Sequence, residues 1–361
     1  MRRLVFCAAI LLVSCLVAAP GIPPQLGHDD PAGQAAPAGG KGFRGSTCCG
    51  NGGGFTAENM SFDEACFRGT SLRRPIEWWY FDAVFDNGYS VEFHVNLGAA
   101  GRLGVVAAMM NFYAGGDLVA HAERTFPAWT LEGSSDGPSL WLSGQQVMEG
   151  FVNAGGRWVF NLSLGLDGCN VDLQFVSTSR AWKADILGMW WWGVVQPRAS
   201  VTGSIGFGGR HIAVNGTGYH EHAWEGRLPN VKGWFWGKMA GEQLGVVWTD
   251  VIKYPWRHYR MVTVNTVGIG YVNLPAENIY ISMENYTRVE GWRLPTSFVL
   301  RAHGDDVSVA VTARALDITP QVSAGPFNYW RYHVLVEGVV RRGDVAEELH
   351  TREIMDYTRF W

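Results

Sequence analysis

The chain has 361 residues, of which 47% are hydrophobic and 17% charged, and its formal net charge at pH 7 is −4. That length suits two domains of ordinary size or one large β domain. The charge balance shows no basic excess, so we expect no nucleic-acid partner. The 17 Trp, 18 Phe, 12 Tyr and 46 Gly favour aromatic-rich strands joined by tight turns over helical bundles. Most of these rings fill a β core, and the remainder suit the walls of a site for an apolar ligand.

The N-terminus has the pattern of an export signal, because Met1-Arg2-Arg3 precedes an apolar run, Leu4–Val13, that is too short to span a bilayer. Leu12-Val13-Ser14-Cys15 resembles the bacterial lipobox, whose cysteine is lipidated. We expect residues 1–15 to be a lipoprotein-type signal peptide and Cys15 to be the lipidation site. The exported protein would then be anchored on the outer side of the cytoplasmic membrane or cell envelope. The alternative is conventional cleavage after Ala18 or Ala19, which would give a secreted protein.

Residues 16–55 are rich in Gly, Ala and Pro and show almost no hydrophobic periodicity. Such a segment buries too little apolar surface to offset the entropy lost on ordering, so we expect a disordered tether. Export would place Cys48, Cys49, Cys66 and Cys169 in an oxidising compartment. A disulfide from Cys66 to one of the vicinal pair is therefore expected, although the sequence does not determine the connectivity.

Two strand patterns flank Asn87-Gly88, a strong hairpin signal. A two-residue turn there would put Phe81 opposite His94 and Trp79 opposite Asn96, on a face that ends at Glu77. This mixed face would either line a cavity or lie half-solvated. The opposite face would be core, formed by Trp78, Tyr80, Val84, Val91, Phe93 and Val95.

Strand patterns continue to the C-terminus, and helical periodicity is limited to Ser61–Cys66 and a turn near Val345–Leu349. The second half loosely echoes the first, because Trp234-Phe235-Trp236 and Leu244–Val251 parallel the hairpin described above. We therefore predict an all-β fold of two barrel-like sheets in tandem. The expected N-terminal domain spans residues 56–210 and the expected C-terminal domain spans residues 211–361.

The stretch Gly216–Met239 concentrates two histidines, two glutamates and three tryptophans between glycines. Titratable groups crowded among rings are typical of a buried polar site, because the rings exclude water and shift pKa values. A connector whose aromatics close a barrel end is the alternative. His220 and His222 lie two apart, with Glu225 nearby, and so match part of a metal-ligand pattern. No third histidine completes that pattern, and we expect no bound metal.

Glu77-Trp78-Trp79-Tyr80-Phe81 and Gly218-Tyr219-His220-Glu221-His222-Ala223-Trp224 resemble two motifs of a known family. That family is carotenoid 1,2-hydratase (hydroxyneurosporene synthase), within the AttH-like, lipocalin-type superfamily. The resemblance spans residues 60–361 and implies two tandem lipocalin-like (calycin-type) β-barrel or sandwich domains. It also implies a cofactor-free reaction.

The acidic position of the family falls on Glu221, which lies between His220 and His222. The resemblance implies that Glu221 protonates an alkene, that indole faces stabilise the resulting cation and that one of these histidines acts as a base. The residues expected to contact the ligand are Glu77, Trp79, Phe81, His94, Asn96, Tyr219, Trp224, Trp234 and Trp236. The sequence departs from the motif in three ways: Glu221 replaces Asp, Ala223 replaces Asn and Glu225 precedes Gly226.

These patterns predict an exported protein that binds a long hydrophobic molecule, of the isoprenoid, polyene or lipid kind, between its two β domains. Acid-catalysed hydration, isomerisation or cyclisation are the reactions that the resemblance implies. The competing hypothesis is a non-catalytic carrier lipoprotein of the cell envelope. The two differ at Glu221, because an enzyme needs its acidity and a carrier does not.

Overall fold

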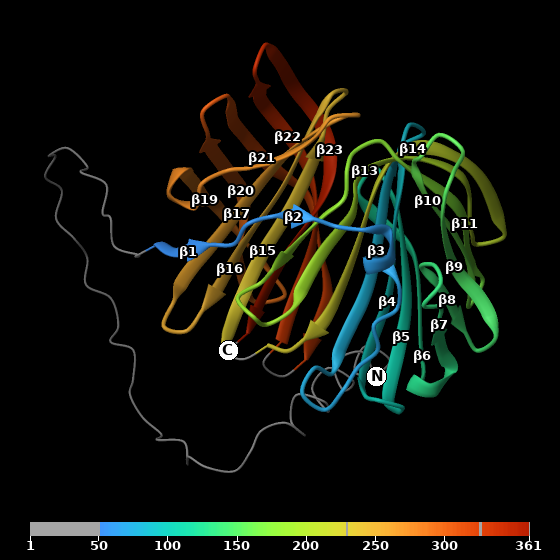
Figure 1. Ribbon diagram of the computed structural model, residues 1–361. Helices are drawn as coiled ribbons and strands as arrows, with labels where there is room; N and C mark the ends of the chain where they lie inside the picture. The colour runs from blue at the N-terminus through green and yellow to red at the C-terminus, as the bar shows by residue number, and fades with distance from the viewer. Residues whose placement is uncertain (1–50, 229, 325–326, 361) are drawn as a thin grey trace, which may run out of the picture.

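The computed structural model describes residues 51–228, 230–324 and 327–360, which form two large, mainly antiparallel sheets (Figure 1). The predicted signal peptide with Cys15, most of the predicted tether, and Cys48 and Cys49 lie outside the described residues. Within those residues no helix is long and apolar enough to cross a membrane. The helical turns described are three short 3-10 segments: η2 (Phe62–Ala65), η3 (Ala128–Thr130) and η4 (Ala276–Asn278).

The first sheet has 13 strands in the order β6-β5-β4-β3-β14-β13-β11-β10-β9-β8-β7, with β12 beside β13 and β2 beside β12, and it curls into a nearly closed barrel. Its strands are β2 (Glu58–Asn59), β3 (Ile76–Phe85), β4 (Tyr89–Ala100), β5 (Leu103–Ala114), β6 (Asp117–Pro127), β7 (Leu131–Gly133), β8 (Ser139–Leu142), β9 (Gln145–Val152), β10 (Trp158–Leu166), β11 (Cys169–Ser177), β12 (Trp182–Asp185), β13 (Trp191–Phe207) and β14 (Arg210–Gly226).

The second sheet has ten strands in the order β1-β17-β16-β15-β23-β22-β21-β20-β19, with β18 on β17, and forms a half-barrel. Its strands are β1 (Asn51–Gly54), β15 (Val231–Ala240), β16 (Leu244–Lys253), β17 (Arg257–Thr266), β18 (Gly270–Asn273), β19 (Ile279–Val289), β20 (Trp292–His303), β21 (Val307–Ala324), β22 (Phe327–Arg342) and β23 (Val345–Phe360). β1 runs parallel to β17, and the other pairs of neighbouring strands are antiparallel.

The predicted all-β fold with two tandem barrel-like domains is confirmed. The boundary between the two sheets lies later in the chain than residue 210, because β14 pairs with both β3 and β13 of the first sheet. The chain passes to the second sheet between Gly226 and Val231. The turn expected near Val345–Leu349 is wrong, since these residues begin β23.

The hairpin turn at residues 86–88 is one residue longer than expected. Gly88 adopts a φ of 83°, and its N–H donates to the carbonyl of Phe85 at 3.1 Å. Asp86, Asn87 and Gly88 therefore form a three-residue loop, in which glycine takes the left-handed position that the chain needs before the second strand. The expected two-residue turn was wrong.

This difference of one residue changes which side chains share a face. Phe81 lies opposite Phe93, and Tyr80 lies opposite His94. Because side chains alternate along a strand, a slip of one residue moves each side chain of one strand to the other face relative to its partner. The barrel interior therefore receives Trp79 and Phe81. The face toward the second sheet carries Trp78, Tyr80, Asp82, Glu92, His94 and Asn96.

Three clusters of buried hydrophobic side chains hold the fold together. The first fills the barrel interior and includes Phe81 and Phe160. The second lies inside the half-barrel and includes Phe235. The third lies between the sheets and joins residues such as Tyr80 of β3 and Trp236 of β15. A strand such as β3 is thus covered on both faces, which requires apolar residues at odd and even positions alike.

Two buried ion-paired groups also connect the sheets. In the first, Lys238 of β15 lies 3.1 Å from Asp82 of β3 and 2.7 Å from Glu353 of β23. Burial raises the pKa of both carboxyl groups, and the pKa of the lysine is raised because the two acids outweigh its own burial. The cation therefore keeps its charge between two carboxyl groups in a water-poor contact.

In the second group, Arg331 of β22 lies 2.6 Å from Glu92 of β4 and 2.8 Å from Asp356 of β23. The arginine is fully buried and also donates to the hydroxyl of Tyr80 at 2.6 Å. Both groups have the same plan, in which an acid of the first sheet and an acid of β23 share one cation of the second sheet. They fix the lateral position of the two sheets, because a buried charge without its partner is costly.

Replacing Lys238 with methionine should lower the free energy of unfolding by about 3–5 kcal/mol, because Asp82 and Glu353 would remain buried without their cation. Urea denaturation measures this change. The matched control is Arg314→Met, which breaks an exposed ion pair with Glu337 and should cost less than about 1 kcal/mol. Equal losses in the two variants would contradict a central role for the buried lysine.

Candidate functional site

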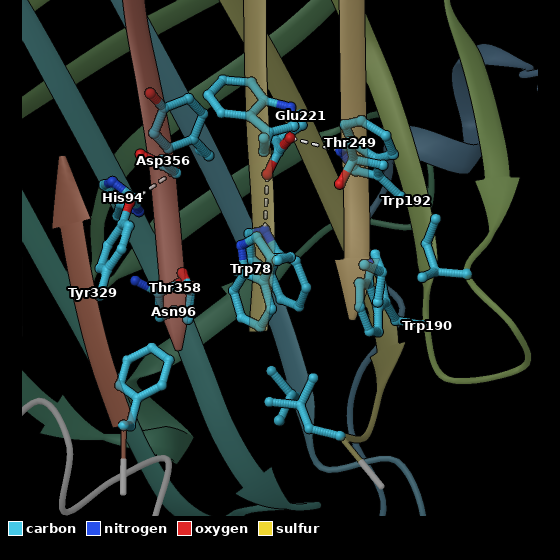
Figure 2. Close-up of a pocket in the computed structure, with 18 of the residues that line it drawn as sticks. Trp78, His94, Asn96, Trp190, Trp192, Glu221, Thr249, Tyr329, Asp356 and Thr358 are labelled. Atoms are coloured by element: carbon cyan, nitrogen blue, oxygen red, sulfur yellow. Dashed lines mark hydrogen bonds between the residues drawn. The ribbon is translucent and has the colours of Figure 1, made fainter. Parts of the chain in front are cut away.

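A cavity of about 150 Å³ lies between the two sheets, and both sheets contribute to its walls (Figure 2). Its aromatic lining is dense, with five tryptophans, two tyrosines and one phenylalanine. These are Trp78, Trp190, Trp192, Trp234, Trp236, Tyr80, Tyr329 and Phe327. The polar and charged side chains of the lining are His94, Asn96, Glu221, Thr249, Asp356 and Thr358. A mostly aromatic cavity with a few convergent polar groups is the usual form of a site for an apolar molecule.

Glu221 of β14 lies on the aromatic side of this cavity. Its Oε1 accepts a hydrogen bond from the indole N–H of Trp78 at 3.1 Å, and its Oε2 accepts one from the indole of Trp192 at 2.6 Å (Figure 2). The hydroxyl of Tyr219 lies 2.8 Å from Oε2. These three contacts hold the carboxyl in one orientation against the cavity.

Burial raises the pKa of Glu221, and the hydrogen bonds from Trp192, Trp78 and Tyr219 oppose part of that rise. An indole N–H can only donate, so both carboxyl oxygens remain acceptors. The Tyr219 hydroxyl can donate or accept, and it can therefore stay bonded when the carboxyl gains or loses a proton. Burial thus favours the protonated form of Glu221, and the indoles and the Tyr219 hydroxyl can still donate to the carboxylate that remains after proton transfer. A general acid needs both properties.

Asp356 lies on the other side of the cavity. The Tyr329 hydroxyl donates to its Oδ2 at 2.9 Å, and the guanidinium of Arg331 lies 2.8 Å from its Oδ1. Burial raises the pKa of Asp356 to about 8 despite the arginine, and the charges of Glu92 and Glu221 contribute to the rise. A carboxyl with this pKa is largely protonated at pH 7, which leaves Arg331 paired mainly with Glu92.

The charge of Glu92 differs from that of Asp356 although both contact Arg331. Burial alone would raise the pKa of Glu92, but Arg331 and His94 together lower it to about 2. His94 contacts Glu92 closely, yet burial lowers the pKa of the imidazole. The wall around Asp356 therefore carries one carboxylate, one guanidinium and one neutral carboxyl, with a neutral imidazole beside them.

The structure separates Glu221 from the two histidines that flank it. His220 lies in the barrel interior, stacked on Phe81 at 3.7 Å between ring centroids. Burial lowers its pKa to about 3, so the ring is neutral. His222 is also fully buried there, with Nε2 2.9 Å from Glu77 and its ring stacked on Trp79. Alternation along β14 sends these side chains away from the cavity that Glu221 faces.

The residues expected to contact a ligand divide between the same two places. His94, Asn96, Trp234 and Trp236 line the cavity, and Tyr219 contacts Glu221 beside it. The barrel interior holds the remaining four, namely Glu77, Trp79, Phe81 and Trp224. The one-residue difference in the hairpin explains much of this division, because it exchanges the faces on which Trp79 and Trp78 lie.

Several residues of the site were not predicted from the sequence. Trp78 is next to the expected Trp79 in the sequence, but the register predicted for the hairpin placed it on the core face. Trp192 belongs to the conspicuous run Trp190-Trp191-Trp192, whose composition marks it as unusual. Asp356, which lines the cavity, and Arg331, which contacts it, carry no local signal, because only the packing of β22 and β23 against β3 and β4 brings them together with Glu92.

Within residues 51–228, 230–324 and 327–360, no three His, Cys, Asp or Glu side chains are placed to hold a metal ion together. The separation of His220 from Glu221 across the sheet is one geometric reason, since ligands of one ion must converge. Cys66 and Cys169 are buried thiols that are not bonded to each other. The expected partners of Cys66 lie outside the described residues.

No known sequence family and no curated protein matches this chain. Among solved structures, an AttH protein from Nitrosomonas europaea aligns with a TM-score of 0.58 and 14% identity, over 81% of this chain and 95% of that protein. Kievitone hydratase from Nectria haematococca aligns with a TM-score of 0.51 and 9% identity, over 84% of this chain and 96% of that enzyme. CghA gives a TM-score of 0.48.

At these identities the likeness concerns the fold. Both of the first two structures are covered almost completely, so the similarity extends over the paired sheets and not over one of them. The chain has the AttH-like, lipocalin-type fold of two tandem β domains, as the Glu-Trp-Trp-Tyr-Phe and Gly-Tyr-His-Glu-His-Ala-Trp motifs predicted.

Proposed function

We propose that this protein binds a hydrophobic molecule of the isoprenoid, polyene or lipid kind between its two β domains and transfers a proton to it from Glu221, without a cofactor. The observation that carries this proposal is the Glu221 carboxyl itself. It faces an aromatic cavity, its pKa is raised by burial, and two indoles and a phenol fix its orientation. An oriented carboxyl whose proton is favoured by burial, beside apolar walls, suits protonation of a carbon–carbon double bond.

Hydration is the leading reaction class, and a hydratase is among the proteins that share this fold. In that reaction the Glu221 proton forms a C–H bond with one alkene carbon, and the electron pair of the double bond is consumed. The other carbon becomes cationic and is stabilised by the indole faces of the lining. Water then bonds to that carbon, and one of its protons returns to the Glu221 carboxylate. Isomerisation would instead return a proton from the neighbouring carbon.

His220 and His222 have no place in this sequence of steps, since their rings lie in the barrel interior. Glu221 acts as both acid and base in turn, as the balance of protons allows. We assign His222 a positioning role, because its contact with Glu77 joins β14 to β3 directly beside Glu221.

The cavity volume limits how the ligand is held. About 150 Å³ accommodates a group of the size of a benzene ring, so a long molecule would place only its reacting end beside Glu221. The remainder would leave through the end of the cavity formed by Leu228 and Phe327. We further propose that the protein is exported and held at the cell envelope through Cys15.

A non-catalytic carrier is the second candidate. The tryptophans that line the cavity would also retain an apolar molecule without any reaction. The ionisable Glu221 carboxyl in that wall favours an enzyme. Burying a carboxyl among indoles costs its hydration free energy, and a carrier would gain nothing in return.

Glu221→Gln should lower the turnover of an alkene substrate at least about 100-fold while the protein still retains the ligand, because glutamine keeps one acceptor oxygen but cannot supply the proton. The measurement is mass spectrometry of the full chain incubated with lipid and polyene extracts. A product heavier by one water, or an isomer of unchanged mass, should form with the wild type alone.

Asp356→Asn is the matched control, since it alters the other carboxyl of the same cavity. If Asp356 delivers the proton, this variant loses activity and Glu221→Gln keeps it, which would overturn the assignment. Retention of the same unaltered molecule by the wild type and both variants would leave the carrier.

The rate should fall as pH rises through the raised pKa of Glu221, because only the protonated carboxyl is active. Trp192→Phe removes a hydrogen bond that lowers this pKa, so the descending limb of the pH–rate profile should move to higher pH by about one unit. The control is Trp191→Phe, whose ring stacks on Trp224 on the other face. A limb that stays in place with Trp192→Phe would contradict Glu221 as the acid.

A further inference from the structure

One end of the molecule collects the turns of both sheets that adjoin the cavity. In the first sheet Ile76 pairs with Gly98 and Gly226, so the segment before β3, the β4–β5 turn and the end of β14 lie together. In the second sheet Gly233 pairs with Ile252 and Arg359, so the start of β15, the β16–β17 turn and the end of β23 lie together. This cavity end is on the lower side of the molecule in Figure 1, near the C label.

Large apolar side chains are exposed at the cavity end. Seven large hydrophobic side chains of the described residues are more than half exposed, and five of them lie there. They are Leu72 at 70%, Leu103 at 76%, Trp129 at 56%, Tyr254 at 65% and Trp256 at 57%. Trp129 belongs to η3, which follows the end of β6 at Pro127, opposite Val105 near the β4–β5 turn. Exposed large apolar side chains concentrated at one end of a molecule are typical of an interaction surface.

The same end is strongly basic although the chain as a whole is acidic. Its turns carry Arg73, Arg102, Lys253, Arg257 and Arg359, together with Arg74, Arg227 and Lys232. Carboxylates lie at this end as well, and two of them have partners: Glu225 pairs with Arg74, and Asp185 accepts a hydrogen bond from the N–H of Gly188. The formal net charge of the chain is −4, so this concentration of positive charge is local.

The cavity reaches this end, because Leu228 and Phe327 line it and belong to the β14–β15 connection and the start of β22. Exposed tryptophan and tyrosine among arginine and lysine match the composition of a membrane–water interface, where amphipathic rings sit at the level of the headgroups. Positive charges add attraction to anionic lipids.

We propose that the cavity end is a docking surface for an anionic phospholipid bilayer, with Leu103, Tyr254 and Trp256 entering the headgroup region and Arg102 and Arg257 contacting lipid phosphates. This surface is distinct from any anchor at Cys15, and its binding requires no ligand. Only one consequence rests on the proposed function: an apolar ligand would pass between the bilayer and the cavity without crossing water.

The experiment measures co-sedimentation of the full chain with vesicles, in a Cys15→Ser background that keeps the N-terminal segment the same in every arm. Binding should be at least about 10-fold stronger to phosphatidylglycerol-containing vesicles than to phosphatidylcholine alone, and salt should weaken it. Arg102→Gln with Arg257→Gln should weaken binding roughly 25-fold, from about 5-fold for each neutralised cation. Trp256→Ser should weaken it several-fold.

Matched controls lie at the opposite end of the strands. Arg210→Gln with Arg341→Gln removes two exposed arginines, and Ile269→Ser removes a side chain that is 68% exposed. These variants should bind within about 2-fold of the parent. Equal binding by all variants, or equal binding to both kinds of vesicle, would overturn the docking surface.

Hydrogen–deuterium exchange gives a second, local measurement. Vesicles should slow exchange at residues 101–103 and 253–257 and leave residues 208–210 and 267–269 unchanged. Protection confined to residues before 51 would show that the N-terminus alone binds the membrane. Sedimentation without vesicles tests the alternative that a second copy of the chain covers this surface. A dimer that Trp256→Ser dissociates would support that alternative and contradict the docking surface for a bilayer. Loss of vesicle binding with unchanged Glu221-dependent turnover would separate this inference from the proposed function.

Discussion

The central constraint of this fold is that β3 and the second half of β14, residues 218–226, lie side by side with both of their faces covered. One face closes the barrel interior and the other meets the second sheet, so polar groups on these segments lie in one of two protein interiors. Side chains alternate between these two interiors. Trp78, Tyr80 and Asp82 meet the second sheet, as do Tyr219 and Glu221, while Trp79, Phe81, His220 and His222 close the barrel. Every chemical role in the site follows from which of the two interiors a residue faces.

Charge across the sheet interface is balanced by the same geometry. Each of the two ion-paired groups brings two carboxyl groups to one cation, which leaves one negative charge too many for a buried contact unless a proton is retained. In the group at the cavity that proton belongs to Asp356, with a pKa near 8, because Glu92 has stronger partners. The cavity is thus bounded by Glu221 in a tryptophan wall and Asp356 in a polar wall, and both carboxyl groups favour their protons for the same reason, which is burial.

The site was only partly predictable, and the reason is visible in two places. At residues 86–88 the sequence Asp-Asn-Gly permits both a two-residue turn on Asn-Gly and a three-residue loop ending in glycine. The contact of Asp86 with Asn215 of β14 accompanies the longer loop, and that neighbour is 129 residues away. In the sequence, His220, Glu221 and His222 form one cluster, yet consecutive strand residues face opposite ways, so Glu221 and its two neighbours do not share a cavity.

By itself the sequence determined the all-β class and the tandem arrangement, and it drew attention to Glu221 as a candidate acid. These follow from local properties: alternating apolar residues, glycine and proline at turns, and aromatic residues around titratable ones. Tertiary structure decided which indoles hold Glu221, that Asp356, paired with Arg331, lines the same cavity from the second sheet, and that basic and aromatic turns gather at one end. Those features depend on register and on contacts between residues such as Tyr80 and Arg331, 251 positions apart, and no local pattern specifies the registration of two sheets against each other.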